Sequence, residues 1–282
     1  MDTVRETLLQ LSSEEKEERK KVRVDYYYYK GACEDKKKAI HDKPKLGQNW
    51  ESQDNLDYEP TQDIRNKVKP LLKKQARWMF SKEPDITIVP FDTNQKELAE
   101  ELRRFIDNIL RKNLFWKKTR QAFLMSTIKK RVMLRASVKV GNRDVPGNIN
   151  LRYEDVENFS YKEIDGVLTE ARFFQEDLNN YLYEDDENKK TYYIHKFTYK
   201  VIEENTPAKA TYVIETYKGD NLSKPIKEDS QEIGFEENKI PAWLIKNGGE
   251  LGEEFGETDL HDLKPSQDRY NRTTSDVADA IK

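Results

Sequence analysis

The stretch KTYYIHKFTYKVIEE, residues 190–204, decides the fold class. Its side chains fall into two alternating sets, one of Tyr193, His195, Phe197, Tyr199 and Val201, and one of Tyr192, Ile194, Lys196, Thr198 and Lys200. A period of two places successive side chains on opposite faces of a strand. This mixture of apolar and polar residues is typical of a half-buried antiparallel strand, so the sequence predicts a sheet built around this segment.

The same period of two recurs along the second half of the chain. It is found in residues 132–140, 148–153, 156–164, 167–175 and 210–219. Asp165-Gly166 joins two of these segments and is a strong hairpin signal. Because helical patterns precede and follow these strands, we predict an α+β fold, with helices packed on an antiparallel meander sheet and a terminal helix after it.

Before residue 131 the apolar residues recur at helical spacing instead. Residues 3–24 predict a charged, solvated helix, and residues 61–80 predict another, in which Pro70 marks a kink or a second start. Residues 82–90 predict a short strand bounded by prolines.

The clearest amphipathic helix is predicted for residues 97–111, and residues 114–131 predict a second helix that pairs with it. The apolar stripe of the first helix comprises Leu98, Leu102, Phe105, Ile106, Ile109 and Leu110. We expect this stripe to face the core with Phe105 and Ile109 at its centre, in which case Phe105→Ala should cost ~3 kcal/mol of stability.

The composition of the chain excludes several classes of protein. Hydrophobic residues make up 35% of the 282 residues and charged residues 37%, so a free monomer would have a thin core and burial against partners is plausible. A net charge of −3 argues against a strongly basic nucleic-acid binder. Cys33 is the single cysteine, and no apolar run is long enough for a signal peptide or a membrane span. We therefore expect a chain that assembles in the cytosol, without a membrane partner.

No arrangement of residues predicts a catalytic, metal or cofactor site. His41, His195 and His261 each lack a second ligand at zinc-site spacing. The glycine-rich stretch 248–257 is crowded with glutamates that would repel phosphate, so a flexible acidic turn is favoured there over cation binding. The basic cluster 129–135 is interpreted as a helix end with cations, with contact to DNA phosphates as the alternative.

The terminal segment is the most informative part of the chain. Its apolar seam is spaced alternately by three and four residues, and its candidate inter-subunit residues are Leu263, Gln267, Tyr270, Thr274, Val277 and Ile281. Polar members interrupt the seam, which suits helices packed side by side in a ring around water. Without such partners, we expect the residues beyond about Ser275 to fray.

An ordered set of motifs resembles portal proteins of tailed bacteriophages, of the kind found in long-tailed phages and prophages of Gram-positive bacteria. The C-terminal motifs are Ile240-Pro241, Asn247, the acidic glycine-rich turn, Thr258 to Leu260, Tyr270-Asn271 and Ser275-Asp276. Earlier segments agree in order, namely 28–31 with Ile40, 66–86 and 150–166, although Ser81 to Pro84 lacks the family's glycine.

The resemblance implies a homo-oligomeric ring, typically dodecameric, at one capsid vertex, through which DNA is packaged and ejected. It implies a structural conduit without catalysis or cofactor. The implied partners are the terminase motor, scaffold or capsid and head-completion proteins, and double-stranded DNA that passes without sequence specificity. The implied location is the virion, with the host cytoplasm during assembly.

The resemblance also implies a division of the chain. We expect an N-terminal helix and mobile loop in 1–60, a wing-like α+β body in 61–257, and the start of a stem-like helix in 258–282, with the clip, second stem helix and crown absent. Such a chain should be mostly a monomer or weak oligomer by itself. The alternatives are a non-enzymatic interaction module that pairs through its terminal helix and, less favoured, a metal-dependent nuclease that uses the acidic loop.

Overall fold

The computed structural model describes residues 2–31, 61, 63–90, 92–139, 148–164, 166–183, 186–200, 209–233, 239–249 and 253–281. Some sequence-based expectations concern positions outside these residues. These positions are Cys33, Ile40, His41, the 42–60 loop, Asp165 and the acidic turn at 250–252. The chain divides into two compact units. The first comprises Met1–Glu17 and Val132–Ile245, and the second comprises Glu18–Arg131 and Lys246–Lys282.

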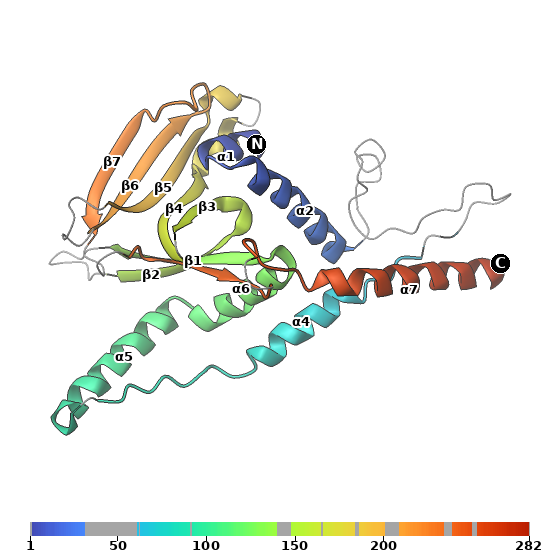
Figure 1. Cartoon of the computed structure of the whole chain (residues 1–282), viewed down its shortest axis with the longest axis horizontal. Coiled ribbons are helices and arrows are strands. Elements are labelled where there is room, and N and C mark those ends of the chain that lie inside the picture. The colour runs from blue at the N-terminus through green and yellow to red at the C-terminus, as the bar shows by residue number, and fades with distance from the viewer. Residues whose placement is uncertain are drawn as a thin grey trace. The chain divides into compact units, whose positions relative to one another are not determined.

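The first unit contains the predicted meander. Its five-stranded antiparallel sheet has the order β3-β4-β5-β6-β7, with consecutive strands side by side (Figure 1). The strands are β3 (Phe159–Ile164), β4 (Val167–Glu176), β5 (Thr191–Lys200), β6 (Lys209–Lys218) and β7 (Lys227–Ile233). His195 on the central strand pairs with Phe173 on one side and Ile214 on the other. The α+β class and the meander are thus confirmed.

A smaller, three-stranded sheet has the order β2-β1-β8. Its strands are β1 (Arg131–Lys139), β2 (Asn148–Asp155) and β8 (Ala242–Lys246). The first unit also has helix α1 (Asp2–Leu8) and the short 3-10 helices η2 (Val156–Asn158), η3 (Leu178–Tyr183) and η4 (Glu187–Lys189).

Both faces of β5 contribute to the core. On one face, Tyr192 and Ile194 are buried against the last residue of α1 and the residues just after it. The whole cluster comprises Leu8, Leu9, Leu11, Phe174, Tyr192, Ile194 and Tyr217. On the other face, Phe197 packs edge-on against Phe173 and stacks on Tyr212. The alternation predicted for this strand therefore separates two packed faces rather than a packed face from a solvated one.

Two extended segments depart from the sequence prediction. β7 was missed because KEDSQEI has almost no apolar residue, and charges are typical of an edge strand, where they discourage pairing with other chains. Residues 82–90, predicted as a strand, form none, and Val89 is 81% exposed. A strand needs a hydrogen-bonded neighbour, and the described part of the chain supplies none for this segment.

The second unit is helical. It contains α2 (Ser13–Lys30) from Glu18 onward, α4 (Val68–Met79), η1 (Thr93–Gln95), α5 (Lys96–Lys112), α6 (Phe115–Lys129) and α7 (Leu260–Ile281). Its core joins four of these helices through Tyr28, Tyr29, Val68, Leu72, Ile128 and Leu260. Helix α4 begins at Val68, so Pro70 lies in its first turn. The N–H groups of a first turn have no partner within the helix, so proline is tolerated there.

The expected orientation of α5 was wrong. Phe105 is 57% exposed, Leu98 54% and Leu102 44%, while Ala99 is the buried residue of this helix. The spacing of the stripe was assigned correctly, but only its C-terminal half, Ile106, Ile109 and Leu110, is even half-buried. An amphipathic pattern indicates which face of a helix is apolar without indicating what packs against it.

Candidate functional site: the C-terminal helix

Helix α7 runs without a break from Leu260 to Ile281, with Pro265 inside it. The prediction of a terminal helix is confirmed, and the helix does not restart at Pro265. Its buried residues are Leu260, Gln267, Asn271 and Ser275. Three of these four are polar, so the face that α7 buries is held by hydrogen bonds.

The base of α7 is anchored to the end of α6. The Thr258 hydroxyl lies 3.1 Å from the carbonyl oxygens of both Thr127 and Ile128, and the Asp259 N–H donates to Thr127 O at 2.9 Å. The last carbonyls of a helix have no partner within the helix. Thr258 and Asp259 therefore supply hydrogen bonds to the last carbonyls of α6, and the same contacts fix the position where α7 begins.

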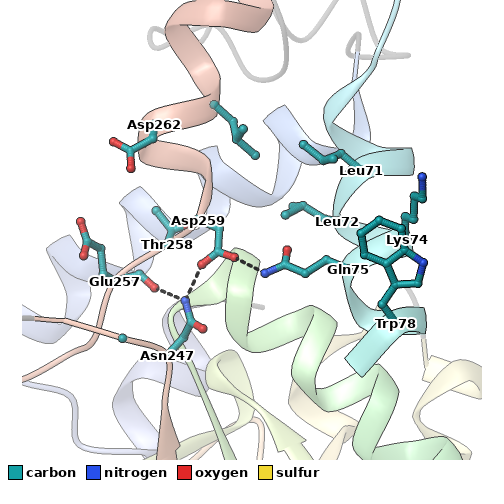
Figure 2. A pocket seen from close by; sticks show the side chains of 12 residues that line it. Leu71, Leu72, Lys74, Gln75, Trp78, Asn247, Glu257, Thr258, Asp259 and Asp262 are labelled. Atoms are coloured by element: carbon teal, nitrogen blue, oxygen red, sulfur yellow. Dashed lines mark hydrogen bonds between the residues drawn. The ribbon is translucent and has the colours of Figure 1, made fainter. Parts of the chain in front are cut away.

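Asp259 also links α7 to two other segments (Figure 2). Its Oδ1 accepts a hydrogen bond from Asn247 Nδ2 at 2.8 Å, and its Oδ2 accepts one from Gln75 Nε2 of α4 at 3.1 Å. Asn247 Nδ2 is also 2.8 Å from the carbonyl of Glu257. These bonds tie the segment at Asn247, α4 and the base of α7 together.

A pocket of about 560 Å³ lies beside this base, between α4 and α7. Leu71, Leu72, Trp78 and Leu263 form its apolar lining, and Glu257 and Asp262 lie on the side of α7 (Figure 2). The indole of Trp78 is 70% exposed, with Lys74 Nζ 4.6 Å from its ring centroid. The pocket offers an exposed aromatic surface with an acidic edge.

A second anchor of α7 comes from α2. The Tyr28 hydroxyl donates to Asp268 Oδ1 at 2.7 Å and lies 3.0 Å from the carbonyl of Lys264. The Lys264 ammonium pairs with Asp25, whose side chain is nearly buried. Burial, followed by the hydrogen bond to Asp268 and its charge, raises the pKa of Tyr28 far above its usual range. The carboxylate of Asp268 thus favours the protonated form of the hydroxyl that bonds to it.

The third anchor is the extended segment before α4, which we call the strap: Thr61 and residues 63–67. The N–H of Lys67 donates to Gln267 Oε1 at 2.9 Å, and Gln267 Nε2 donates back to Arg65 O at 2.9 Å. Further bonds join the strap to α7, namely Arg65 N–H to Asn271 Oδ1 at 3.2 Å, Asp63 N–H to Ser275 Oγ at 2.9 Å, and Thr61 N–H to Asp279 Oδ2 at 3.0 Å. We call the acceptors, Gln267, Asn271, Ser275 and Asp279, the polar stripe.

The residues predicted for contacts between subunits differ in how deeply they are buried. Gln267 is 4% exposed and belongs to the polar stripe, while Leu263 and Thr274 are half-buried. Tyr270, Val277 and Ile281 are 38%, 53% and 81% exposed. No contact between subunits is present in a single chain, so that role stays a prediction.

Asn271, Ser275 and Asp279 were missed as contact residues. Their signal was present in the sequence, because polar residues recur at every fourth position from Gln267, which places them on one helix face. The expectation that the end of α7 lacks partners in the isolated chain needs correction, since Ser275 and Asp279 both accept hydrogen bonds from the strap. Fraying beyond Ser275 stays a prediction.

The first unit holds a separate polar cluster around His195. Its Nδ1 lies 2.6 Å from the Tyr212 hydroxyl and its Nε2 lies 3.1 Å from Gln175 Oε1. Burial, and then the nearby Arg135 and Arg152, lowers the pKa of His195 to about 4. Both nitrogens of this imidazole are hydrogen-bonded to neighbouring side chains of the sheet.

Metal and membrane sites were sought in the same described residues. These contain no group of three or more His, Cys, Asp or Glu side chains placed to hold a metal ion. None of their helices combines the length and apolar character that a membrane crossing requires.

Comparison with protein families gives a match over residues 8–282, to the family described as phage portal protein, SPP1 Gp6-like. The match covers nearly the whole chain. The chain belongs to the SPP1 Gp6-like family of phage portal proteins. A search of curated proteins found no match.

Several residues that carry the resemblance to portal proteins have structural roles around α7. Thr258 closes the end of α6, Asn271 and Ser275 receive the strap, and Asn247 holds Asp259. Portal proteins are structural components of phage capsids, so membership of this family assigns the chain a phage portal function. The portal motifs of this chain thus converge on the placement of one helix.

Proposed function

We propose that the chain is the subunit of a ring at a capsid vertex, through which double-stranded DNA is packaged and later ejected. In this proposal α7 is the start of the stem-like helix in the channel wall, and the chain has no catalysis of its own. The observation that carries the proposal is the family match over residues 8–282, together with a helix that is hydrogen-bonded to α6, α2 and the strap.

The free faces of α7 support packing into a ring. With 3.6 residues per turn, Tyr270, Val277 and Ile281 lie on one side of the polar stripe, and the exposed Arg272 and Asp276 lie on the other. Head-to-tail contacts need two different surfaces on each subunit, and they close into a ring when the rotation between neighbours permits it. An apolar flank and a charged flank on the same helix are two such surfaces.

The finer features of the proposal come from the family. A ring of about twelve copies, contacts with the terminase motor, scaffold or capsid and head-completion proteins, and passage of DNA without sequence specificity are all part of it. The divisions 1–60, 61–257 and 258–282 are retained as proposed functional regions.

Sedimentation of variants across a concentration series tests the proposal. We expect the 282-residue chain to associate weakly at high concentration and Val277→Glu/Ile281→Glu to stay monomeric, because carboxylates would be buried against the neighbouring helix. The matched control is Thr273→Glu/Ala280→Glu, which adds the same charge on the remaining exposed face of α7.

The proposal fails if the chain stays monomeric at every concentration, or if the two double variants behave alike. Association that stops at a dimer would favour the alternative, an interaction module that pairs through its terminal helix.

A further inference from the structure

The exposed apolar residues of α5 form a ridge along one side of that helix. Leu98, Leu102 and Phe105, which we call the α5 ridge, are all exposed. Their spacing of four and then three residues places them in line over about 10 Å of helix. This pattern is the one by which an amphipathic helix lies in an apolar groove of a partner.

The pocket between α4 and α7 offers a wall of matching length. On its α4 side, the exposed side chains of Leu71 and Trp78 lie seven residues apart, as do the two ends of the α5 ridge (Figure 2). Leu263 adds apolar surface on the α7 side. None of the residues that line this pocket comes from α5, so the ridge and the pocket are two different surfaces of the second unit.

The charges beside the two surfaces are complementary. On α4, the exposed Lys74 and Arg77 lie along one flank of the apolar wall, and this helix contains no acidic residue. On α5, the exposed Glu97 and Glu101 lie along the flank of the ridge that has the same sense of rotation about the helix axis. Two helices that run antiparallel bring such flanks together, so the acidic flank of α5 would face the basic flank of α4.

The other edge of the pocket selects the same orientation. Glu257 and Asp262 lie on the α7 side, across the pocket from Lys74 (Figure 2). A helix in the parallel orientation would turn Glu97 and Glu101 toward these carboxylates. Because like charges that face each other oppose binding, the antiparallel orientation is favoured.

We propose that the α5 ridge of one copy lies in the pocket of a second copy, antiparallel to α4, with Glu101 next to Lys74. Since the ridge and the pocket differ, each copy gives its ridge to one neighbour and receives the ridge of another, which is a head-to-tail contact. So small a contact is weak by itself, and it adds to the association through α7. Its place in a ring rests on the proposed function, whereas the contact itself does not.

Disulfide trapping tests the contact in chains that carry Cys33→Ser and Val277→Glu/Ile281→Glu, so that neither the native thiol nor the apolar flank of α7 takes part. One chain also carries Glu101→Cys and the other Lys74→Cys, both at exposed positions outside the ridge and the apolar wall. We expect oxidation of the equimolar mixture to give at least ~5-fold more mixed dimer than either like dimer, because only the mixed pair brings the thiols within disulfide reach.

Glu100→Cys is the matched control for Glu101→Cys, because it is the neighbouring exposed residue and points to another side of α5. It should give no such excess of mixed dimer. The addition of Leu102→Gln/Phe105→Gln to the Glu101→Cys chain should lower the yield of mixed dimer at least ~10-fold, since it removes the apolar anchors of the ridge. Equal yields from Glu100→Cys and Glu101→Cys, or a yield that the ridge variant leaves unchanged, would overturn the contact.

A chain that carries both Glu101→Cys and Lys74→Cys separates a second copy from the same chain. We expect links between chains, in a yield that rises with concentration. A disulfide closed within one chain at every concentration would mean that the ridge lies in its own pocket, and would overturn the proposal. The trapped chains lack the apolar flank of α7, so equal behaviour of the two α7 double variants in sedimentation would refute the ring through α7 and leave this contact standing.

Discussion

The hydroxyl of Tyr28 on α2 donates a hydrogen bond of 2.7 Å to Asp268 on α7, across 240 positions of sequence. Tyr28 is 5% exposed, so water does not replace this bond when it is lost. Asp268 lies one residue from Gln267, the first member of the polar stripe. The pair holds α7 in place next to the strap.

Removal of this hydroxyl should weaken the second unit. We expect Tyr28→Phe to lower the free energy of unfolding by about 1–3 kcal/mol, since the bond involves a carboxylate and its donor hydroxyl lies on a buried side chain. Urea unfolding measures the change through the midpoint. Tyr27→Phe is the control, because Tyr27 is 42% exposed, and an equal effect of the two variants would contradict the assigned role of Tyr28.

The exposed stripe of α5 reverses the expectation from the sequence. Phe105→Ala should change the stability of the monomer by less than about 0.5 kcal/mol, as surface substitutions usually do. Leu72→Ala, at a residue 2% exposed in the core of the second unit, should cost about 2–5 kcal/mol. Thermal unfolding of both variants compares them directly, and a large loss in Phe105→Ala would mean that α5 is covered.

At Gly256, a side chain would be strained by the backbone conformation and would collide with neighbouring main-chain atoms. Its φ is +75°, and a Cβ would lie 2.9 Å from Lys130 O and 3.0 Å from Asn247 O. We expect Gly256→Ala to cost about 3 kcal/mol, from the left-handed conformation and the close contacts together. Gly248, with φ +47° and no described atom near its Cβ position, is the control, and Gly248→Ala should cost about 1 kcal/mol. Equal losses would show that the close contacts relax.

His195 should make the first unit less stable in acid. Its pKa is about 4 in the folded chain against 6.5 ordinarily, so between these values the unfolded chain binds a proton that the folded chain excludes. The free energy of unfolding should therefore fall as the pH drops from about 6.5 to about 4, by on the order of 3 kcal/mol.

Replacement of His195 separates its contribution from that of other groups. His195→Gln should flatten the stability profile in this pH range, while His261→Gln, at an exposed position, should not. The measurement is urea unfolding at a series of pH values. An unchanged slope in His195→Gln would show that other groups cause the acid sensitivity.

The parts of the fold that follow from local pattern were predictable. The alternation in residues 190–204 identified β5 because a strand's period is independent of its neighbours, and the spacing of Leu260 and Leu263 identified α7 for the same reason. β7 was missed because an edge strand has little need of apolar side chains. The exposed face of α5 was misassigned because periodicity does not reveal the partner of a face.

The polar stripe shows a different limit of sequence reasoning. The seam through Tyr270, Val277 and Ile281 was chosen because apolar residues are expected to be buried, whereas α7 buries Asn271 and Ser275 instead. Their partners are main-chain atoms of the strap, about 200 residues away, and main-chain atoms leave no trace in the side-chain pattern. The polar stripe itself can be found in the sequence, but its partner is visible only once the fold is known.

The most direct test of a ring built through α7 is the mass of its disulfide-linked products. In a chain carrying Cys33→Ser, the changes Tyr270→Cys and Arg272→Cys place one thiol on each flank of α7, too far around the helix to bond within one chain. We expect oxidation at high concentration to give a ladder of linked chains that ends at one closed species of more than two copies, with either single variant stopping at dimers. Glu101→Cys/Arg103→Cys, at exposed positions of α5 with the same spacing, controls for chance collisions. A double variant that also stops at dimers, or gives no more linkage than the α5 control, would contradict the ring.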